Sequence, residues 1–336
     1  TINIVYLQNQ YDPFFGDNEI WCSSWPTAAK AAFDAAASIW GTTLQSTVPI
    51  KVYACWTGDL QPGVLGGSGT DAFVHNFPNA PLSNTWYPVS LANALSGSDQ
   101  NGSEPEMHHV YNMNFDWYYG TDGNTPGNQY DFLTTVLHEM GHGLGFAGSM
   151  TVDEQGVGSW GLGSSQESIA YDRFTENGSG QALLNYGNGT TALGDQLTSN
   201  NVYFDGPKAN AANGGQRPPL YAPSSWVPGS SYSHLGEVFN NTPNALMTYS
   251  MGSGESVHDP GPVTKGLLHD LGWQEYNTAP GISGIPDQHV SMNIGGSSLI
   301  DLWAYASDDQ TPSGELTYSI DNSPAAGAGV SIAGNR

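Results

Sequence analysis

Basic side chains are scarce in this chain. Among 336 residues, seven are Lys or Arg and 31 are Asp or Glu, which gives a formal net charge of −24 at pH 7. Such a surface repels phosphate backbones and anionic membranes, so we expect no nucleic acid among the partners. Charged residues make up only 11% of the chain, against about 25% in typical domains. Gly, Asn, Ser and Thr replace them, as in secreted, loop-rich proteins.

Long apolar runs are also absent. No run reaches the roughly 18 residues that a helical membrane span requires, so we expect no membrane span. The chain starts at Thr1 with neither a methionine nor a signal peptide, which is typical of the processed form of an exported protein. We therefore expect a secreted protein, and we expect it to be a monomer.

Cysteine is limited to two residues, Cys22 and Cys55. In an exported protein two cysteines are expected to form one disulfide that closes a long loop. Two buried thiols are the alternative. A zinc site built on cysteine is disfavoured, because no second thiol lies near either residue in the sequence.

The N-terminal part of the chain alternates between strand and helix patterns. Residues 1–7 and 48–56 have the composition and alternation of strands. Between them, residues 26–44 place alanine and aromatic side chains at helical spacing, and Pro26 suits the first turn of a helix. Because strand–helix–strand crossovers are right-handed, we expect two parallel neighbouring strands backed by this helix.

A second helix is expected within residues 131–148, which contain the segment His138-Glu139-Met140-Gly141-His142. The two histidines are four residues apart, so a helix places them on one face, one turn apart. Two imidazoles at that spacing can share one Zn²⁺, with Glu139 beside the water that the metal activates. This is the H-E-x-x-H pattern of zinc proteases, in which both histidines are ligands and the glutamate is the general base.

A catalytic zinc needs a third protein ligand. The extended motif H-E-x-x-H-x-x-G-x-x-H would place it at position 148, where this chain has Gly148. Gly145 fits its place in the motif, because a glycine with positive φ ends a helix and turns the chain. The third ligand must therefore come from elsewhere, and Glu167, His234 and His258 are the candidates.

The chain resembles the metzincin clan of zinc proteases over most of residues 1–275. The resemblance is carried by the motif helix, the distant Ser-His pair at His234, the Asn-Ala-Leu-Met-Thr run at 244–248 and the closing Asp-Leu-Gly-Trp at 270–273. Within the clan it is similar to leishmanolysin-type enzymes, whose third histidine is displaced by a long insertion. In this chain 92 positions separate His142 from His234. The resemblance implies that this insertion walls one side of the cleft.

The resemblance also implies roles for individual residues. It implies zinc ligands at His138, His142 and His234, and a catalytic Glu139. It implies a Met-turn methionine, Met247, beneath the metal.

Tyr249 follows Met247 by two residues. In astacin-like and serralysin-like metzincins a tyrosine at that offset approaches the metal and can hydrogen-bond the oxyanion, which implies a catalytic role for Tyr249. An ordinary amphipathic tyrosine packed near the cleft is the alternative.

Residues 106–115 form a further strand-like run just before the motif helix. In metzincins the strand in this place is the sheet edge that lines the cleft and pairs with an extended substrate, and the resemblance implies the same here. His108 and His109 point to opposite faces of such a strand, so we expect structural roles for them. The Asp- and Asn-rich stretch 116–131 is expected to be a solvated loop, with a Ca²⁺ site as the alternative.

The composition changes near Asn277, beyond which stretches 282–290, 298–305 and 315–320 alternate like short strands. They resemble the start of bacterial cadherin- or immunoglobulin-like repeats, whose calcium-binding members carry acids where this chain has Asp301, Asp308 and Asp309. The 60 residues that remain are few for a sandwich of about 100 residues. We expect a truncated or reduced β-domain at 277–336.

Together these observations predict an α+β fold. The expected architecture is a metzincin-like zinc protease with a twisted mixed sheet, a backing helix and an active-site helix, followed by a small β-sandwich-like segment. The catalytic domain would span residues 1–276, with an upper subdomain over 1–147 and a lower subdomain over 148–276.

The predicted function is a secreted zinc endopeptidase that hydrolyses protein or peptide substrates with Glu139 as general base. Its acidic surface should favour cationic or neutral substrates. The rival function is a non-catalytic adhesin or glycan-binding module on a metzincin scaffold, because ten Trp and 17 Tyr could build sugar-stacking sites. The intact Glu139 argues against the rival, since a binding protein has no use for a base beside an open zinc position.

Overall fold

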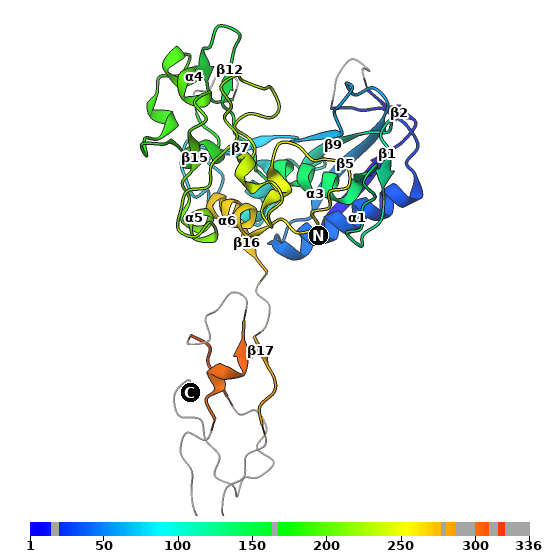
Figure 1. The fold of residues 1–336 in the computed structure, drawn as a ribbon, viewed down its shortest axis with the longest axis vertical. Coiled ribbons are helices and arrows are strands. Elements are labelled where there is room, and N and C mark those ends of the chain that lie inside the picture. Colours follow the sequence, from blue (N-terminus) through cyan, green and yellow to red (C-terminus); the bar gives the residue numbers. More distant parts are fainter. Residues whose placement is uncertain (15–19, 163–166, 277–279, 287–299, 309–314, 320–336) are drawn as a thin grey trace, which may run out of the picture. The chain divides into compact units, whose positions relative to one another are not determined.

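The computed structural model describes residues 1–14, 20–162, 167–276, 280–286, 300–308 and 315–319. The chain divides into two compact units, Thr1–Glu275 and Tyr276–Arg336. The described residues form a mixed α+β fold, as expected (Figure 1). Within these ranges the helices are all too short or too polar to cross a bilayer.

The first unit is built on a four-stranded sheet with the order β1-β5-β9-β6. β1 (Ile2–Leu7), β5 (Ile50–Thr57) and β9 (Met107–Asn112) are parallel, and β6 (Gly66–Thr70) runs antiparallel to β9. The expected parallel pairing of the first two strands is therefore confirmed. The chain passes between them through α1 (Thr27–Thr43), whose buried residues recur at helical spacing.

The sheet edge beside the motif helix is β6, and the expectation that residues 106–115 form this edge is wrong. β9 pairs with β5 on one side and with β6 on the other. β6 comes from a glycine-rich stretch, Gly-Gly-Ser-Gly-Thr, whose sequence lacks the apolar alternation that marks a strand. A side chain cannot replace the hydrogen of Gly66, because its Cβ would lie 2.9 Å from both Val110 O and Tyr111 Cδ1.

The outer edge of β6 presents main-chain groups of alternate residues. The Asn112 N–H donates to Leu65 O at 2.9 Å, and the Asp71 N–H donates to Glu106 O at 3.0 Å. These bonds place every second residue from Leu65 to Asp71 in the hydrogen-bonded pairs of an antiparallel ladder. The N–H and C=O groups of the residues between them therefore point away from β9, namely those of Gly66, Ser68 and Thr70.

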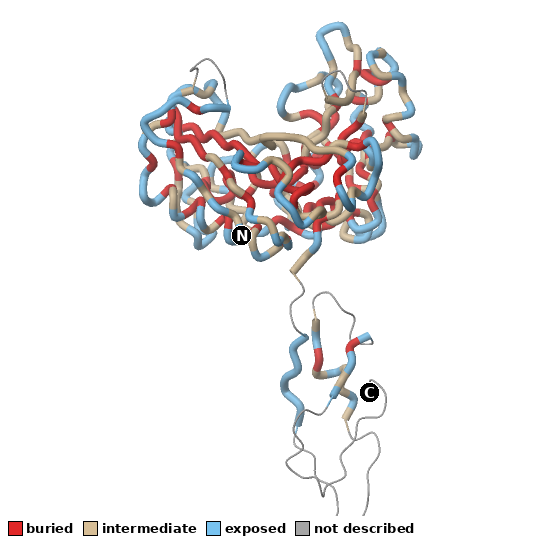
Figure 2. Tube along the Cα trace, turned by 180° about the vertical axis from the view of Figure 1, so that it is seen from behind, coloured by how far each residue is buried: buried red, intermediate tan, exposed pale blue. Residues whose placement is uncertain are grey.

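Two helices cover one face of this sheet, α1 and the motif helix α3 (Phe132–Gly143). They are joined by a hydrogen bond from Trp40 Nε1 to Leu137 O at 2.9 Å. The rings of Phe33 and Tyr111 meet at 5.6 Å, and those of Tyr111 and Phe132 at 5.2 Å, so both helices pack on the same side of β9. In Figure 2 the buried residues concentrate along these strands and helices.

The opposite face of the sheet carries the disulfide between Cys22 and Cys55, which confirms the expected pairing of the two cysteines. It links β3 (Trp21–Cys22) to β5. Leu7 and Val110 pack with the two cysteines in a small buried cluster.

The remaining elements of the first unit are short. The helices are α2 (Val89–Ser96), α4 (Thr191–Leu197), α5 (Pro207–Ala212) and α6 (Pro262–Leu271), with 3₁₀ turns η1 (Tyr171–Phe174), η2 (Leu183–Asn185), η3 (Glu237–Phe239) and η4 (Ala245–Met247). The two-stranded pairs are β2 (Gln10–Tyr11) with β3, β4 (Leu44–Gln45) with β16 (Gln274–Glu275), β7 (Phe73–His75) with β8 (Trp86–Pro88), β10 (Trp117–Tyr118) with β11 (Tyr130–Asp131), β12 (Thr151–Val152) with β13 (Gly158–Ser159), and β14 (Thr175–Asn177) with β15 (Val202–Phe204).

The second unit is described only in part. β17 (Gly281–Ile282) pairs antiparallel with β18 (Ala306–Ser307), and η5 (Leu302–Ala304) precedes β18. Where residues 298–305 are described they contain this 3₁₀ turn, so the expected strand is wrong there. Asp301 caps the turn by accepting from the Trp303 N–H at 3.2 Å. The expected strand at 315–320 is wrong where it is described, because residues 315–319 contain no strand. Of the expected strand at 282–290, only Ile282 lies in a strand and 283–286 do not. Residues 287–290 and Asp309 lie outside the described residues.

Candidate metal centre

The helix α3 begins and ends where its sequence predicts. The Asp131 carboxylate caps it by accepting from the Thr134 N–H at 2.6 Å. Gly145, just beyond the helix, has φ 118°, a conformation that favours glycine. The buried residues of α3 include Phe132, Leu133, Val136 and Leu137, which fix the helix so that its histidine face is turned away from the sheet.

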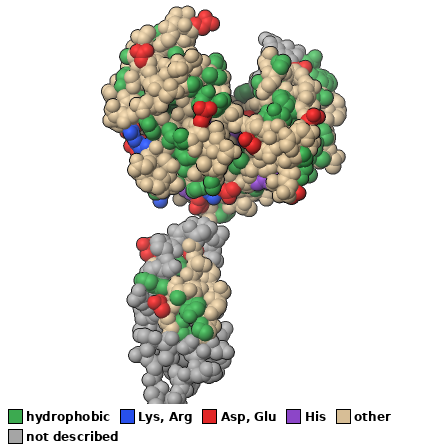
Figure 3. Space-filling view, viewed as in Figure 1, with side chains coloured by type: hydrophobic (Ala, Val, Ile, Leu, Met, Phe, Trp, Pro, Cys, Tyr) green, Lys and Arg blue, Asp and Glu red, His purple; other side chains and the backbone are tan. Residues whose placement is uncertain are grey.

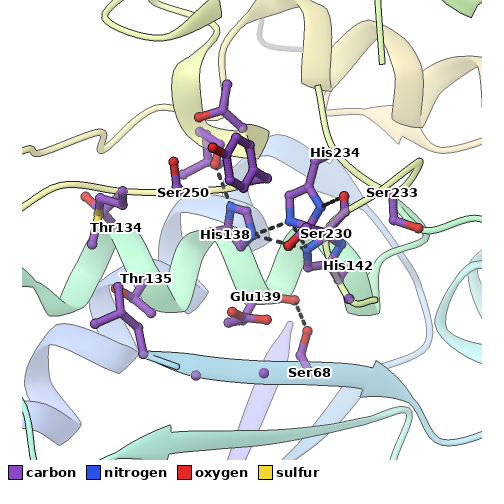
Figure 4. Close-up of a pocket in the computed structure, with 18 of the residues that line it drawn as sticks. Ser68, Thr134, Thr135, His138, Glu139, His142, Ser230, Ser233, His234 and Ser250 are labelled. Carbon is purple, nitrogen blue, oxygen red and sulfur yellow. Dashed lines mark hydrogen bonds between the residues drawn. The ribbon is translucent and has the colours of Figure 1, made fainter. Parts of the chain in front are cut away.

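Three imidazoles converge above α3 (Figure 4). His138 Nε2 and His142 Nε2 are 3.1 Å apart, and His234 Nε2 lies 3.2 Å from each of them. His138 and His142 come from the motif, and His234 comes from a loop 92 residues beyond His142. The structure thus brings together the two motif histidines and one of the three candidates for the third ligand.

The outward nitrogen of each ring faces a backbone carbonyl. His138 Nδ1 lies 2.6 Å from Leu246 O, and His142 Nδ1 lies 2.7 Å from Phe146 O. His234 Nδ1 lies 2.8 Å from Ser230 O. A carbonyl only accepts, so Nδ1 carries the proton in all three rings. In a neutral ring of this tautomer Nε2 has a lone pair and no hydrogen, and the three Nε2 atoms point at one place.

Burial keeps two of these rings neutral. Burial, followed by the charge of His138, lowers the pKa of His142 to about 3. Burial and the charges of the other two rings also lower the pKa of His234. Neutral imidazoles with inward lone pairs are the form in which histidine binds a metal ion.

This donor set fits Zn²⁺. Two nitrogens bound to one zinc at about 2.0–2.1 Å in a tetrahedral arrangement lie roughly 3.3 Å apart, close to the 3.1–3.2 Å between these atoms. The carbonyls that hold each Nδ1 are the outer partners that usually orient histidine ligands. His138, His142 and His234 are therefore the residues that would hold the metal.

Short β-bridges carry His234 to the motif helix. The Leu235 N–H donates to Met247 O at 2.8 Å, and the Tyr221 N–H donates to His234 O at 2.8 Å. Met247 itself is fully buried beneath α3. A Cβ on Gly141 would lie 2.7 Å from Met247 Sδ, so the glycine between the two motif histidines makes room for this methionine.

The position expected for a third ligand in the extended motif is filled by a tyrosine ring instead. A Cβ on Gly148 would lie 1.9 Å from Cε1 of Tyr232. Tyr232 stands two residues before His234, has φ 73° and is fully buried. Only a glycine at 148 leaves room for the segment that brings His234 in.

A buried carboxylate, Asp172, holds this segment. It accepts from the Tyr232 hydroxyl at 2.9 Å and from the Ser149 N–H at 3.0 Å. It also bonds the Ser149 hydroxyl and accepts from the Ile169 N–H at 3.2 Å. Burial raises the pKa of Asp172, and these hydrogen bonds oppose the rise. Asp172 thus ties both ends of the insertion together.

Glu139 lies on α3 between the motif histidines, with its side chain largely buried. The hydroxyl of Ser68 on β6 bonds the Glu139 carbonyl, which fixes the helix to the sheet edge (Figure 4). Burial raises the pKa of the Glu139 carboxyl, while the charge of His138 lowers it by less. A raised pKa brings a carboxylate closer to the range in which it can both accept and return a proton.

Tyr249 lines the same cavity as the histidines. Its ring stacks on Tyr221 with the centroids 3.9 Å apart, and its hydroxyl donates to Glu237 Oε1 at 3.4 Å. Both contacts are compatible with either role expected for Tyr249.

The cavity that contains the histidines has a volume of about 1040 Å³. β6 and α3 line one part of it, and residues from within 228–234 and 240–257 line another, so the insertion and the Met-turn segment supply walls. Gly, Ser, Thr and Asn make up much of the lining.

The other metal-ligand candidates lie elsewhere. Glu167 pairs with His75 Nδ1 at 3.0 Å, and His258 Nε2 lies 2.9 Å from the Asp131 carboxylate. Within the described ranges, groups of three or more His, Cys, Asp or Glu that converge are the histidine cluster and a set formed by Asp12 and the two disulfide cysteines. The disulfide leaves no thiolate in the latter set.

The two adjacent histidines of β9 have separate partners. His108 stacks on Phe14 with the ring centroids 4.5 Å apart, and its Nδ1 lies 3.2 Å from Asp71 Oδ1. His109 Nδ1 lies 2.9 Å from the Tyr111 hydroxyl on the other face.

In the loop before α3, Asp122 accepts from the Tyr118 hydroxyl at 2.7 Å and from the Asn124 N–H at 3.1 Å.

Sequence reasoning missed the roles of Gly148, Asp172 and Tyr232. Asp172 acts through Ser149 and Tyr232, which are 23 and 60 residues away in the sequence. One signal was available, because a glycine stands at the position that a histidine fills in the extended motif.

Comparison with known proteins gives one partial match. A protein-family model described as SPBPB7E8-like matches residues 87–157, a span that includes α3 with His138 and His142 but not His234. No curated protein and no solved structure matches the chain. The matched span is well under half of the chain and does not by itself establish the family to which the whole chain belongs.

Proposed function

We propose that this chain is a zinc-dependent endopeptidase of the metzincin type, with the leishmanolysin-like displacement of its third histidine. The observation that carries the proposal is the convergence of three imidazole nitrogens, 3.1–3.2 Å apart, beside a buried glutamate in an open cavity. Bound zinc would supply Lewis acidity toward water and toward the scissile carbonyl.

The chain's own residues supply the remaining chemistry. Glu139 accepts a proton from the attacking water and returns it to the amine nitrogen as the C–N bond breaks. Its largely buried carboxylate supports this task, because burial raises its pKa. Met247, buried against Gly141 between the two motif histidines, is assigned as the Met-turn methionine. Tyr249 lines the same cavity, and the proposal assigns to its hydroxyl the stabilisation of the negative charge that develops on the reacting carbonyl.

The substrate is proposed to bind as an extended peptide along β6. The main-chain groups of Gly66, Ser68 and Thr70 face the free side of the edge strand and line the cavity. A peptide that adds as a further strand would hydrogen-bond these groups. Ser68 also bonds the Glu139 carbonyl, so such a peptide would lie beside the proposed base.

We also propose that the protein is secreted and acts as a monomer on proteins or peptides. The disulfide supports an oxidising compartment, because disulfides persist there and are rare in the cytosol. The division into Thr1–Glu275 and Tyr276–Arg336 is close to the catalytic and C-terminal segments proposed from the sequence. We propose Ca²⁺ as a second cofactor in addition to zinc.

The rival function, a glycan-binding module, finds less support. Half of the ten Trp are buried in the core and cannot stack on sugars, namely Trp25, Trp40, Trp56, Trp117 and Trp273. The surface pair Tyr11 and Trp21 is exposed, but its rings pack edge to face at 5.0 Å and form no open platform.

The test is peptide release from an unstructured protein such as casein, measured with and without a zinc chelator. We expect release that stops on chelation and returns when zinc is restored. Protein cleavage that is unchanged after zinc removal would defeat the proposal.

Two variants separate catalysis from metal binding. Glu139→Ala should keep full zinc content and lose turnover, and His234→Ala should lose zinc where Glu167→Ala keeps it. Normal turnover by Glu139→Ala would rule out its role as base. Full zinc loading of His234→Ala together with loss in Glu167→Ala would reverse the ligand assignment.

A further inference from the structure

Among the charged side chains that line the cavity, acids are present and Lys and Arg are absent from the described lining residues. Apart from the three histidines, the titratable acids and bases of the described lining are Glu139, Glu255 and the two tyrosines Tyr130 and Tyr249, and no described lining residue is Lys or Arg. The proposed mechanism uses Glu139 as base. Glu255 is therefore a cavity carboxylate without a role in that mechanism.

One oxygen of Glu255 is engaged and the other is available. Oε2 accepts from the Gly252 N–H at 2.8 Å, which closes the turn that carries the glutamate. Oε1 has no hydrogen-bond partner among the described residues, and the side chain is exposed. The carboxylate is thus oriented by its own turn while it keeps a free acceptor toward the cavity.

The backbone on both sides of Glu255 is fixed, on one side to the motif helix and on the other to Gln129, the residue before β11. The Gly254 N–H donates to Gln129 O at 2.8 Å. The Val257 N–H donates to the Thr134 hydroxyl at 2.8 Å. A carboxylate held from both sides loses little conformational freedom when it binds a partner.

Two further bonds strengthen this attachment. Asp131, the buried cap of α3, pairs with His258 Nε2 at 2.9 Å, and the Thr125 hydroxyl lies 2.6 Å from that of Ser256. Segment 254–258 is therefore tied to the beginning of the helix that carries His138.

These bonds place Glu255 within reach of a bound peptide. Thr134 precedes His138 by one helical turn, about 6 Å along the axis, and Val257 bonds Thr134 directly. Two residues from Val257 to Glu255 span at most about 7 Å. Glu255 is then at most roughly 20 Å from His138, the length of about six residues of an extended chain.

We propose that Glu255 determines specificity by binding a lysine or arginine side chain of the substrate, which makes cationic peptides the substrate class. This inference rests on the proposed peptidase function. No cation in the described lining competes for the carboxylate, and the net charge of −24 attracts cationic chains to the cleft. An exposed ion pair of this kind is expected to favour the cationic peptide up to about fivefold. The alternative is that Glu255 serves only to close the turn at Gly252.

The test uses the full zinc-loaded chain carrying Glu139→Gln, which binds peptides without cleaving them. Neutral dodecapeptides would carry one Lys at each position in turn, or Gln at the same position, and their Kd would be measured by fluorescence anisotropy. We expect tighter binding of the Lys peptide, up to about fivefold, at one or two positions. The preference should shrink as salt is added.

Glu255→Gln, added to the same chain, is the decisive variant. Its amide oxygen can still accept from the Gly252 N–H, so the turn is kept while the charge is lost. We expect the Lys preference to disappear. Glu154→Gln removes an equal charge from an exposed turn outside the cavity and should leave the preference intact.

A Lys preference that survives Glu255→Gln, or none at any position, overturns the inference. Cleavage of a neutral peptide by the chain with Glu139 intact would show that the proposed peptidase function survives such a result. If no peptide is bound or cleaved in either charge form, the peptidase proposal fails and the inference fails with it.

Discussion

Tyr232 packs so closely on Gly148 that a Cβ on the glycine would lie 1.9 Å from the tyrosine Cε1. The tyrosine ring therefore depends on the missing side chain at position 148. Two residues later the same segment supplies His234, whose Nε2 lies 3.2 Å from those of His138 and His142. A small residue on one segment thus sets the path of the segment that completes the histidine cluster.

Gly148→Ala should weaken zinc binding. The new methyl group must displace the Tyr232 ring and with it His234, so we expect zinc affinity to fall at least tenfold, as for loss of an outer partner of a ligand. The measurement is competition for zinc against a chromogenic chelator. Gly41→Ala is the control, because a Cβ there meets nothing within 4 Å and the site is helical. Equal zinc affinity in both variants would contradict the proposed coupling.

Asp172→Asn should destabilise the first unit. The buried carboxylate accepts from Ser149, Ile169 and Tyr232, and an amide nitrogen in its place would face these donors. Loss of hydrogen bonds to a buried charged group predicts a free energy of unfolding lower by about 3 kcal/mol. Urea denaturation of the metal-free chain measures it. Asp195→Asn, at an exposed position of α4, should change it by less than about 0.5 kcal/mol. A similar small change for Asp172→Asn would refute the role of the carboxylate.

The protein should lose stability as the pH falls below 6.5. Burial, then the charges of His108 and His142, lowers the pKa of His109 in the folded chain to about 3, against about 6.5 in the unfolded chain. Above pH 6.5 the ring is neutral in both states and contributes nothing. Below it the unfolded chain binds the proton first, so the free energy of unfolding decreases until about pH 3.

His109→Gln tests this term, because glutamine can bond the Tyr111 hydroxyl but does not titrate. Between pH 7.5 and pH 5 the variant should lose about 2 kcal/mol less of its free energy of unfolding than the parent chain. Both proteins would be unfolded with urea in the presence of chelator, so that metal release is the same. Parallel pH profiles would show that His109 does not stay neutral in the folded chain.

Removing the disulfide should destabilise the chain without disturbing the metal site. The bond between Cys22 and Cys55 closes a loop with a sequence separation of 33, which predicts a contribution of about 3–4 kcal/mol. The double change Cys22→Ala, Cys55→Ala should lower the midpoint of urea denaturation accordingly. Zinc content should stay at one ion per chain, since the disulfide lies on the sheet face opposite α3. Loss of zinc by the folded variant would disprove this separation.

The local sequence pattern was sufficient to predict the elements that are determined by short segments of the chain. The helix with His138 and His142 follows from the helical spacing of the two histidines and from the turn at Gly145, both within one stretch. The parallel pairing of the first two long strands follows from the helix between them.

Features that depend on contacts between residues far apart in the chain could not be predicted from the sequence. β6 is a strand because its backbone pairs antiparallel with β9. Its glycine-rich sequence has no apolar alternation that would predict a strand. Asp172 has its function through Tyr232, 60 residues away, and neither residue carries a motif. The closeness of His234 to His142 was reached by resemblance, because no local rule predicts contact across 92 residues.

The position of β6 also bears on self-association. Exposed edge strands are templates on which other sheets can grow, and proteins usually protect them. The residues of β6 line a cavity, so its free main chain is open to a single extended peptide but shielded from the broad edge of another folded sheet. β1, the opposite edge, carries the exposed Val5 and has no charged side chain. We therefore expect any aggregation of this protein at high concentration to begin at β1.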